Sequence, residues 1–470
     1  MEIVMERLTK IGDVKSKSSS EIKYSRLGVG FEKIDRKLHD PEMAYDKMAE
    51  TGIKWARIQS GWARTETEKG VYDFAWLDSI VDNLLARGIE PWIDLCYGNG
   101  LYSEQAKQFF GAVGVLPIDC EEAKQGWANY CTAIAKQYRG KVRYYEVWNE
   151  PDGDWAWNRG PDGRAYGQFT IATAKALRAG DPDVKVIGGS LCQVTSGFLA
   201  EAFEVGMADY VDAITYHEYT PDERRVPSRV RSLRGLIDMY NPKIRIIQGE
   251  SGSQSRSDGC GALARLAWTE KKQAKQLLRH TLVDLESEVD FISYFSCVDM
   301  IEGLNGTEGN VASYRDYGYF GILGADFDEN GMAKGEYKRK ISFRSLQTVC
   351  ALFSEDVHVA PLPIMMVPRD SRRIFSRDSD HTNTTSICFK DNDGKWAYVY
   401  WAPTDIMSTD YEGTVTVHLA GIKEKPHLVD LMDGSIYEIP ESMIEVHPRG
   451  GYYITNLPLK DYPLALTTFC

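Results

Sequence analysis

Two glutamates close apolar segments of the sequence in settings that suit acid–base chemistry. Glu150 ends the run Tyr-Glu-Val-Trp-Asn-Glu, and Glu250 ends the run Ile-Ile-Gln-Gly-Glu. Two carboxyl groups about 5–5.5 Å apart on either side of a glycosidic bond can act as an acid/base and a nucleophile, and then cleave that bond with retention of configuration. The sequence predicts this chemistry if the fold brings both glutamates to one cleft.

The neighbours of these glutamates support the same interpretation. Asn149 places an amide beside Glu150, where it could hydrogen-bond a sugar hydroxyl, and Pro151 ends the strand because it lacks a backbone N–H. Gly249 precedes Glu250 and allows neighbouring backbone to approach closely. The acid must also hold its proton near neutral pH, which burial and a nearby carboxylate can arrange.

The elements that position these residues follow a regular rhythm. We expect strands at 27–31, 54–58, 89–96, 142–148, 184–188, 211–216, 244–248 and 290–296, and helices at 41–52, 76–88, 121–138, 167–179, 198–207, 230–240, 270–286 and 340–353. Eight strand-then-helix units predict an α/β fold, a (β/α)8 TIM barrel. A doubly wound sheet is the alternative, and it is less favoured because GVGFEK after the first strand lacks the third glycine of a phosphate-binding turn.

The pattern changes after residue 354. Apolar and polar residues alternate with period two, and Asn-Asp-Gly and Asp-Gly turns separate the segments. We therefore predict a barrel over residues 21–353 and a C-terminal antiparallel β-sandwich over residues 354–470. Residues 1–20 could add a strand to the sandwich.

In such a barrel the chemistry takes place at the carboxyl ends of the strands. The side chains that we place at this rim are Glu32, Arg57, Trp148, Asn149, Glu150, His217, Tyr219, Glu250 and Tyr294. Trp155 and Trp157 follow in a polar, Gly-rich loop, where their flat rings could stack on a sugar or pack beneath the loop.

Composition excludes several classes of protein. The chain has 55 basic and 68 acidic residues, a net charge of −13, which argues against binding to nucleic acids or anionic membranes. No apolar run approaches the roughly 20 residues of a membrane span, and the N-terminus shows no apolar core of a signal peptide. The nine cysteines include no C-x-x-C pair, as expected for a reducing compartment. We therefore expect a cytoplasmic protein.

The motifs at the strand ends resemble those of a known family. Asn-Glu-Pro at 149–151 after the fourth strand and Glu250 after the seventh resemble clan A of the glycoside hydrolases, retaining enzymes built on this barrel. Further matches are Arg57 on the second strand, the segment 69–74, and the pair His217 and Tyr219 on the sixth strand. With the added β-domain, the chain most resembles family 39, typified by β-xylosidases.

The resemblance implies roles for individual residues. Glu150 would be the acid/base, Glu250 the nucleophile, and Asn149 would bind the hydroxyl next to the anomeric carbon. Arg57 and Tyr219 would hold Glu250 ionised and oriented.

Other rim residues leave the identity of the sugar open. His217 would line the sugar site, the alternative being a histidine of the core. The third strand lacks the histidine that many clan members carry there, and the eighth, Tyr-Phe-Ser-Cys at 294–297, lacks their tryptophan.

These observations predict a retaining glycosidase for short β-glycosides or oligosaccharides, with a β-xylosidase as the main hypothesis. An α-L-arabinofuranosidase, a β-glucosidase, a β-galactosidase and a non-catalytic carbohydrate-binding barrel remain alternatives. A metal-dependent hydrolase or isomerase is disfavoured because, of eight histidines, His217 alone is predicted at the rim. We expect no cofactor or metal, a small carbohydrate as the ligand and, by analogy with the family, self-association into a homo-oligomer.

Overall fold

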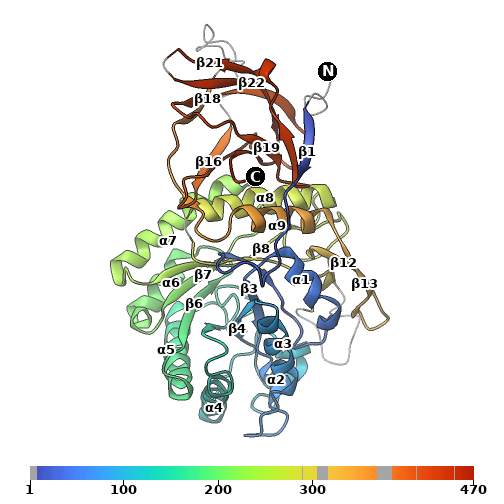
Figure 1. Ribbon diagram of the computed structural model, residues 1–470. Coiled ribbons are helices and arrows are strands. Elements are labelled where there is room, and N and C mark those ends of the chain that lie inside the picture. The colour runs from blue at the N-terminus through green and yellow to red at the C-terminus, as the bar shows by residue number, and fades with distance from the viewer. Residues whose placement is uncertain (1–7, 288, 304–315, 368–383, 409, 449) are drawn as a thin grey trace.

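The structure, a computed structural model, describes residues 8–287, 289–303, 316–367, 384–408, 410–448 and 450–470. Figure 1 shows two parts, a barrel of strands surrounded by helices and a set of antiparallel sheets that lies above helices α8 and α9. The barrel is closed by parallel pairing in the order β2 to β9, with β9 returning to β2. The predicted fold class, a TIM barrel with C-terminal antiparallel sheets, is confirmed.

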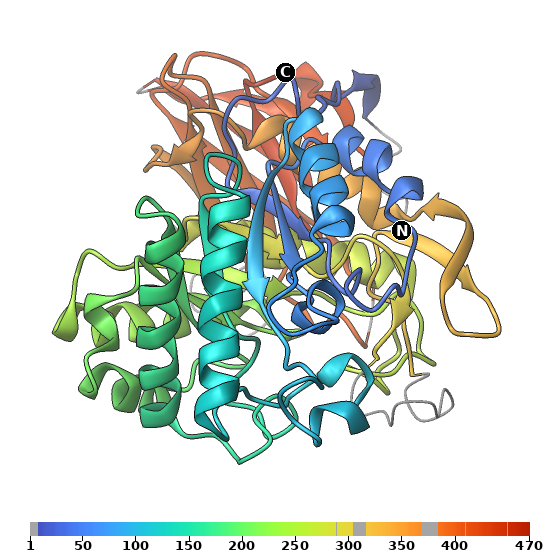
Figure 2. The same cartoon turned by 90° about the horizontal axis from the view of Figure 1, so that it is seen from below.

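The barrel elements lie close to their predicted positions, and the predicted helix at 270–286 matches α8 at both ends. The barrel strands are β2 (Leu27–Gly30), β3 (Trp55–Gln59), β4 (Glu90–Leu95), β5 (Tyr144–Val147), β6 (Lys185–Leu191), β7 (Ala213–His217), β8 (Arg245–Ser251) and β9 (Ile292–Tyr294). The helices are α1 (Tyr45–Thr51), α2 (Trp62–Thr65), α3 (Ala75–Ala86), α4 (Glu121–Gln137), α5 (Gly163–Gly180), α6 (Ser196–Glu204), α7 (Val226–Tyr240), α8 (Glu270–Glu286) and α9 (Ile341–Leu352). In Figure 2 the blue-to-green helices stand side by side outside the strands. Among the described residues, none of the helices is long and apolar enough to cross a membrane.

The barrel interior is layered because successive side chains of a strand point to opposite faces. On β3, Trp55 faces inward and packs on Phe291, with ring centroids 3.8 Å apart, in an apolar cluster that closes the amino-terminal end of the barrel. Two residues further along, Arg57 also faces inward. Asp94 on β4 and Glu146 on β5 occupy the same level, and both contact Arg57. The charged residues thus form a layer between this apolar cluster and the carboxyl-terminal rim of the barrel.

The segment after β9 contains strands that the sequence pattern did not predict. These are the pair β10 (Met300–Ile301) and β11 (Tyr317–Gly318) and the hairpin β12 (Leu323–Phe327) and β13 (Ala333–Arg339). Two-residue strands leave no periodic signal, and β13, with the sequence AKGEYKR, is largely exposed and charged. This insertion brings Glu302 and Phe320 to the barrel mouth.

The C-terminal region forms two antiparallel sheets. One has seven strands in the order β1-β20-β19-β23-β17-β16-β14, and the other has four in the order β15-β18-β22-β21. Their bounds are β1 (Thr9–Asp13), β14 (His358–Val359), β15 (Ile364–Val367), β16 (Thr385–Lys390), β17 (Trp396–Trp401), β18 (Glu412–Ala420), β19 (His427–Asp430), β20 (Ser435–Glu438), β21 (Ile444–Val446), β22 (Gly451–Lys460) and β23 (Leu464–Thr467). The N-terminal strand β1 pairs with β20, while residues 1–7 of the predicted extra segment lie outside the described residues. The division near residue 354 stays a prediction.

Buried charges on α8 join the barrel to these sheets. The fully buried Lys275 contacts Asp410 and lies 2.5 Å from Asp461, which is also buried. Arg279 pairs with Glu223 at 2.8 Å and donates to two backbone carbonyls beyond residue 400. Lys275 and Arg279 both contact groups beyond residue 400, so these buried polar contacts connect the barrel to the sheets.

Lys275→Met should destabilise the protein by about 3–5 kcal/mol, because Asp461 would remain buried without its cation. The matched control is Lys271→Met, whose partner Asp410 is 3.1 Å away and exposed, and which should cost about 0–1 kcal/mol. Urea unfolding followed by circular dichroism measures both. Equal, small losses in the two variants would contradict the assignment of Lys275 to the junction.

Candidate active site

Glu150 lies just beyond the carboxyl end of β5 on an unusual backbone. β5 ends at Val147, and Trp148 and Glu150 have φ angles of 69° and 49°. Such left-handed conformations cost residues with a Cβ about 1–3 kcal/mol each and persist only where the surroundings fix them. Here the Glu150 N–H donates to the carbonyl of Ser190 at 2.8 Å, which ties the turn to the end of β6.

The Trp148 ring provides the other anchor of this turn. Its indole N–H donates to the Ala156 carbonyl at 2.7 Å, and its ring packs edge-on against Trp157 and Phe169. Both tryptophans are at most 1% exposed. Both rings pack beneath the loop, and the structure places neither Trp148 nor Trp157 on the wall of the cavity at the barrel mouth, where the sequence predicted substrate contacts.

Glu250 reaches the same end of the barrel from β8. The pairing of β7 with β8 is irregular here, and His217 pairs with Glu250. A Cβ at Gly249 would lie 3.2 Å from the Thr215 Cβ and 3.3 Å from His217 Nε2. The missing side chain therefore leaves room for the His217 ring between β7 and β8, as the sequence suggested for a close approach.

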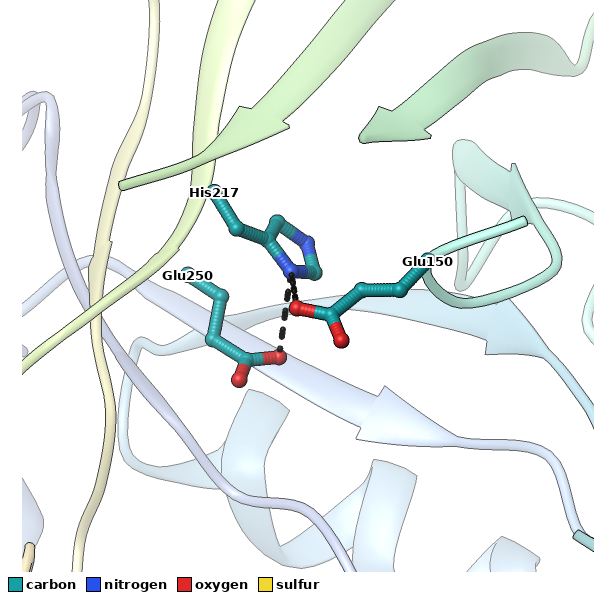
Figure 3. Close-up of side chains that lie close together, drawn as sticks. All are labelled: Glu150, His217 and Glu250. Carbon is teal, nitrogen blue, oxygen red and sulfur yellow. Dashed lines mark hydrogen bonds and ion pairs between the residues drawn. The ribbon is translucent and has the colours of Figure 1, made fainter. Parts of the chain in front are cut away.

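The two glutamates meet at the His217 ring (Figure 3). His217 Nδ1 lies 2.8 Å from Glu150 Oε1 and 3.6 Å from Glu250 Oε2. One oxygen of each glutamate and the ring nitrogen all lie within 4.8 Å of one another. The two carboxyl groups thus face one gap, from opposite sides of the barrel mouth.

Burial and neighbouring charges shift the pKa values of Glu150 and His217. Burial raises the pKa of Glu150, with the Glu250 carboxylate adding to the rise and the His217 hydrogen bond opposing it. Burial alone would lower the pKa of His217, but Glu250 and Glu150 outweigh it and raise that pKa to about 9. His217 is therefore cationic at neutral pH and donates its Nδ1–H to Glu150, which leaves the second Glu150 oxygen for a ligand.

Arg57 lies at the centre of the charged layer and is fully buried. Its Nε donates to Glu146 at 2.7 Å and its Nη2 to Asn149 Oδ1 at 2.8 Å, with Asp94 3.3 Å from the same Nη2. Burial would raise the pKa of Glu146, but the adjacent Arg57 lowers it to about 2, whereas burial holds the pKa of Asp94 well above its usual value. The guanidinium is a pure donor, so Asn149 must turn its Oδ1 to Arg57 and keep its NH2 for another partner.

Two donors reach the Glu250 carboxylate. Arg57 Nη1 lies 3.1 Å from Oε2, and the Tyr219 hydroxyl makes a short hydrogen bond to Oε1. Burial raises the pKa of Tyr219 far above its usual range, and the Glu250 charge adds to this, so the phenol stays protonated and donates. Both donors bind the ionised form of a carboxylate and fix its orientation.

Glu150 and Glu250, together with Asn149 and Tyr219, line a cavity of about 270 Å³, which has room for one sugar ring. Its lining residues are Glu32, Lys33, Arg36, Gln59, Tyr97, Asn149, Glu150, Trp155, Cys192, Tyr219, Glu250, Gly261, Ala262, Phe295, Glu302 and Phe320. Of the predicted residues, Glu32, Asn149 and Trp155 also line this cavity. Tyr294 is buried and does not line it. The predicted Arg57 and His217 are fully buried and do not line the cavity either, and both contact Glu250.

Several lining residues escaped the sequence analysis. Lys33 directs its ammonium to Glu302 at 3.4 Å and lies over the Phe295 ring, and Arg36 contacts Gln59. Lys33 follows the predicted rim residue Glu32 and could have been found there. Glu302 could not, because it belongs to the inserted segment that carries no periodic pattern.

The donor set of Glu150, His217 and Glu250 is also of a kind that binds metal ions. Here, however, the two carboxylates keep a proton on His217 Nδ1, the nitrogen that faces them. A protonated imidazole has no lone pair at that atom for a metal, so a transition-metal ion would first have to displace this proton.

Comparisons with known proteins bear on the family and the fold of the chain. The family described as glycosyl hydrolases family 39 matches residues 36–230, a segment that contains Arg57 and Glu150 and ends before Glu250. A β-xylosidase of Geobacillus stearothermophilus is 25% identical over 162 residues, which cover 32% of this chain and 31% of that protein. The chain thus matches about a third of the length of this curated relative.

Solved structures extend the similarity over the whole chain. A family 39 glycoside hydrolase from Bacteroides cellulosilyticus WH2 aligns with a TM-score of 0.64 and 17% identity, over 94% of this chain and 80% of that one. A family 39 β-xylosidase from Caulobacter crescentus aligns with a TM-score of 0.57 and 18% identity, over 98% of both chains. At this level of sequence identity the solved structures show that the fold is shared. The matched family segment over residues 36–230 and these shared folds confirm the resemblance to glycosyl hydrolases family 39, in clan A, that the strand-end motifs predicted.

Proposed function

We propose that this chain is a retaining glycosidase that cleaves short β-glycosides, with β-xylosides as its substrates. The observation that carries the proposal is the approach of Glu150 and Glu250, whose nearest oxygens lie within 4.8 Å across one cavity. Retaining enzymes need about 5–5.5 Å between the two carboxyl groups, and inverting enzymes need about 6.5–9.5 Å to admit a water.

The reaction takes two displacements. In the first, a Glu250 oxygen attacks the anomeric carbon while Glu150 gives its proton to the leaving oxygen, so that the glycosidic bond breaks and an ester forms. In the second, Glu150 takes a proton from water, the water oxygen attacks the anomeric carbon, and Glu250 leaves as a carboxylate. The Arg57 guanidinium and the Tyr219 hydroxyl then donate hydrogen bonds to the regenerated Glu250 carboxylate, as they do before the reaction.

Asn149 is suited to bind the sugar. Its oxygen accepts from Arg57, so its NH2 group is the part that can face a ligand in the cavity it lines. Donation to the hydroxyl next to the anomeric carbon would orient the ring for attack and gain strength as charge develops there. Trp155 adds an aromatic surface on the same wall.

The choice of a xyloside rests on the relatives. The curated match and one solved relative are β-xylosidases, and the cavity is small. α-L-Arabinofuranosides, β-glucosides and β-galactosides remain the alternatives, because only a few side chains of a site determine which of these sugars it accepts.

A panel of nitrophenyl glycosides tests the proposal directly. The β-xyloside should be hydrolysed fastest, and proton NMR of the first-formed sugar should detect the β-anomer before it equilibrates. A first-formed α-anomer would overturn the retaining mechanism, and a faster rate on another glycoside would overturn the choice of sugar.

Glu250→Gln should lower kcat on every glycoside of the panel by about 10⁴-fold or more, because an amide cannot replace the attacking carboxylate. Glu445→Gln is the matched control, since Glu445 is exposed on β21 of the four-stranded sheet, and it should keep the wild-type rate. Steady-state kinetics and the melting temperature separate loss of chemistry from loss of folding. A Glu250→Gln variant with near-normal kcat would disprove the role of Glu250.

Glu150→Ala should affect substrates according to their leaving groups. With a poor leaving group kcat/KM should fall by about 10²–10⁴-fold, whereas dinitrophenyl glycosides, which need no protonation, should lose far less. Azide should then restore turnover and give a β-glycosyl azide, because it can enter where the carboxylate was and needs no base. Equal losses on both kinds of substrate, with no azide product, would contradict the acid/base role.

A further inference from the structure

Two further carboxyl groups, Glu32 and Glu302, share the cavity with the two glutamates of the proposed mechanism, and Glu32 is the one that contacts Arg57. Glu32 follows β2 at the end of the strand, is 1% exposed, and lines the cavity. Its side chain folds back over Gly30, where a Cβ would lie 3.0 Å from Glu32 Oε2 and 3.1 Å from Oε1. The absence of a side chain at residue 30 therefore gives this carboxyl group its place.

Glu32 and Glu250 contact the same nitrogen of Arg57. Nη1 lies 2.8 Å from Glu32 Oε1 and 3.1 Å from Glu250 Oε2. With Nε on Glu146 and Nη2 on Asn149 and Asp94, the donors of the guanidinium are engaged, and its one charge faces four carboxyl groups. Four carboxylates around one buried cation would repel one another strongly, so protons must neutralise some of them.

The charges around Glu32 indicate whether its carboxyl group is protonated or ionised. Burial raises its pKa to about 7, against the lowering effect of Arg57, and the Glu250 charge adds to the rise while His217 opposes it. The other titratable groups that sense its charge are Asp94, Tyr219 and Cys297. Of these, Tyr219 and Cys297 stay neutral at pH 7, because burial raises the pKa of both side chains. In the proposed reaction Glu250 loses its charge and Glu150 gains one. Of these two, Glu250 is the one that shares Arg57 Nη1 with Glu32.

We propose that Glu32 is a positioning residue that compensates this change of charge. It holds a proton while Glu250 is a carboxylate, and it releases that proton to solvent when Glu250 becomes the glycosyl ester. Arg57 Nη1 then keeps one ionised partner throughout the cycle. When water cleaves the ester and Glu250 regains its charge, Glu32 takes up a proton from solvent. The inference rests on the proposed function, since it assigns a charge partner to the same covalent intermediate.

Carbon-13 NMR of protein labelled at the glutamate carboxyl carbons can follow this proton. The Glu32 signal is the one that disappears in Glu32→Gln. We expect it to titrate near pH 7 in the free enzyme and to titrate about one pH unit or more lower after Glu250 is trapped with 2,4-dinitrophenyl 2-deoxy-2-fluoro-β-xyloside. Asp94, labelled separately and assigned with Asp94→Asn, is the control, because it contacts Nη2 and should stay protonated in both states.

Glu250→Gln gives a second arm that needs no catalysis, since the amide removes the charge as the ester does. If the Glu32 titration falls in Glu250→Gln but the fluorosugar forms no adduct, the proposed function fails and the coupling stands. If the adduct forms and the Glu32 titration does not move, or if Glu32 is ionised from pH 5 upward in the free enzyme, the charge-compensating role is overturned. Should Glu32→Gln fail to fold, Gly30→Ala identifies the signal, because its Cβ displaces the Glu32 carboxyl group.

Discussion

One buried cation organises the polar interior of this barrel. The Arg57 guanidinium carries a single charge that it cannot lose, and it faces carboxyl groups from four positions around the barrel, Glu32, Asp94, Glu146 and Glu250. The apolar layer beneath excludes water and so strengthens each of these interactions. The carboxyl groups must therefore divide protonated and ionised states among themselves. Distance from Arg57 alone does not set this division, because Glu32 at 2.8 Å has a raised pKa and Glu146 at 2.7 Å a lowered one. The chemistry at the rim depends on this arrangement.

The environments of the two catalytic candidates differ in the way that acid and nucleophile require. Glu250 receives two donors, the Arg57 guanidinium and the Tyr219 phenol. Glu150 receives one, from His217, and is otherwise buried, on a turn whose unfavourable φ angles are held by the packing of Trp148. Two carboxyl groups this close cannot ionise independently. Unequal surroundings assign the proton to one of them, as in other sites where paired carboxyl groups take different roles.

The sequence predicted the barrel and most of the rim because both follow from local rules. Alternating strand and helix patterns identify the elements, and strand ends converge at one face, which was enough to bring Glu150 and Glu250 together. The sequence could not predict which rim side chains face the cavity, because the end of a strand fixes where Trp148, His217 and Tyr294 lie along the barrel and not which way their side chains point. Glu302 was missed because it arrives on an insertion without periodicity. The sharing of Arg57 by Glu32 depends on side-chain geometry, which no spacing in the sequence records.

The most direct measurement of the central claim is the position of the covalent intermediate. The protein would be incubated with a 2-deoxy-2-fluoro β-xyloside carrying a dinitrophenyl leaving group, digested with pepsin, and its labelled peptide sequenced by tandem mass spectrometry. The account predicts one sugar per chain, attached to Glu250. A sugar attached to Glu150 or Glu32, or steady hydrolysis of β-xylosides with inversion and no adduct, would contradict it.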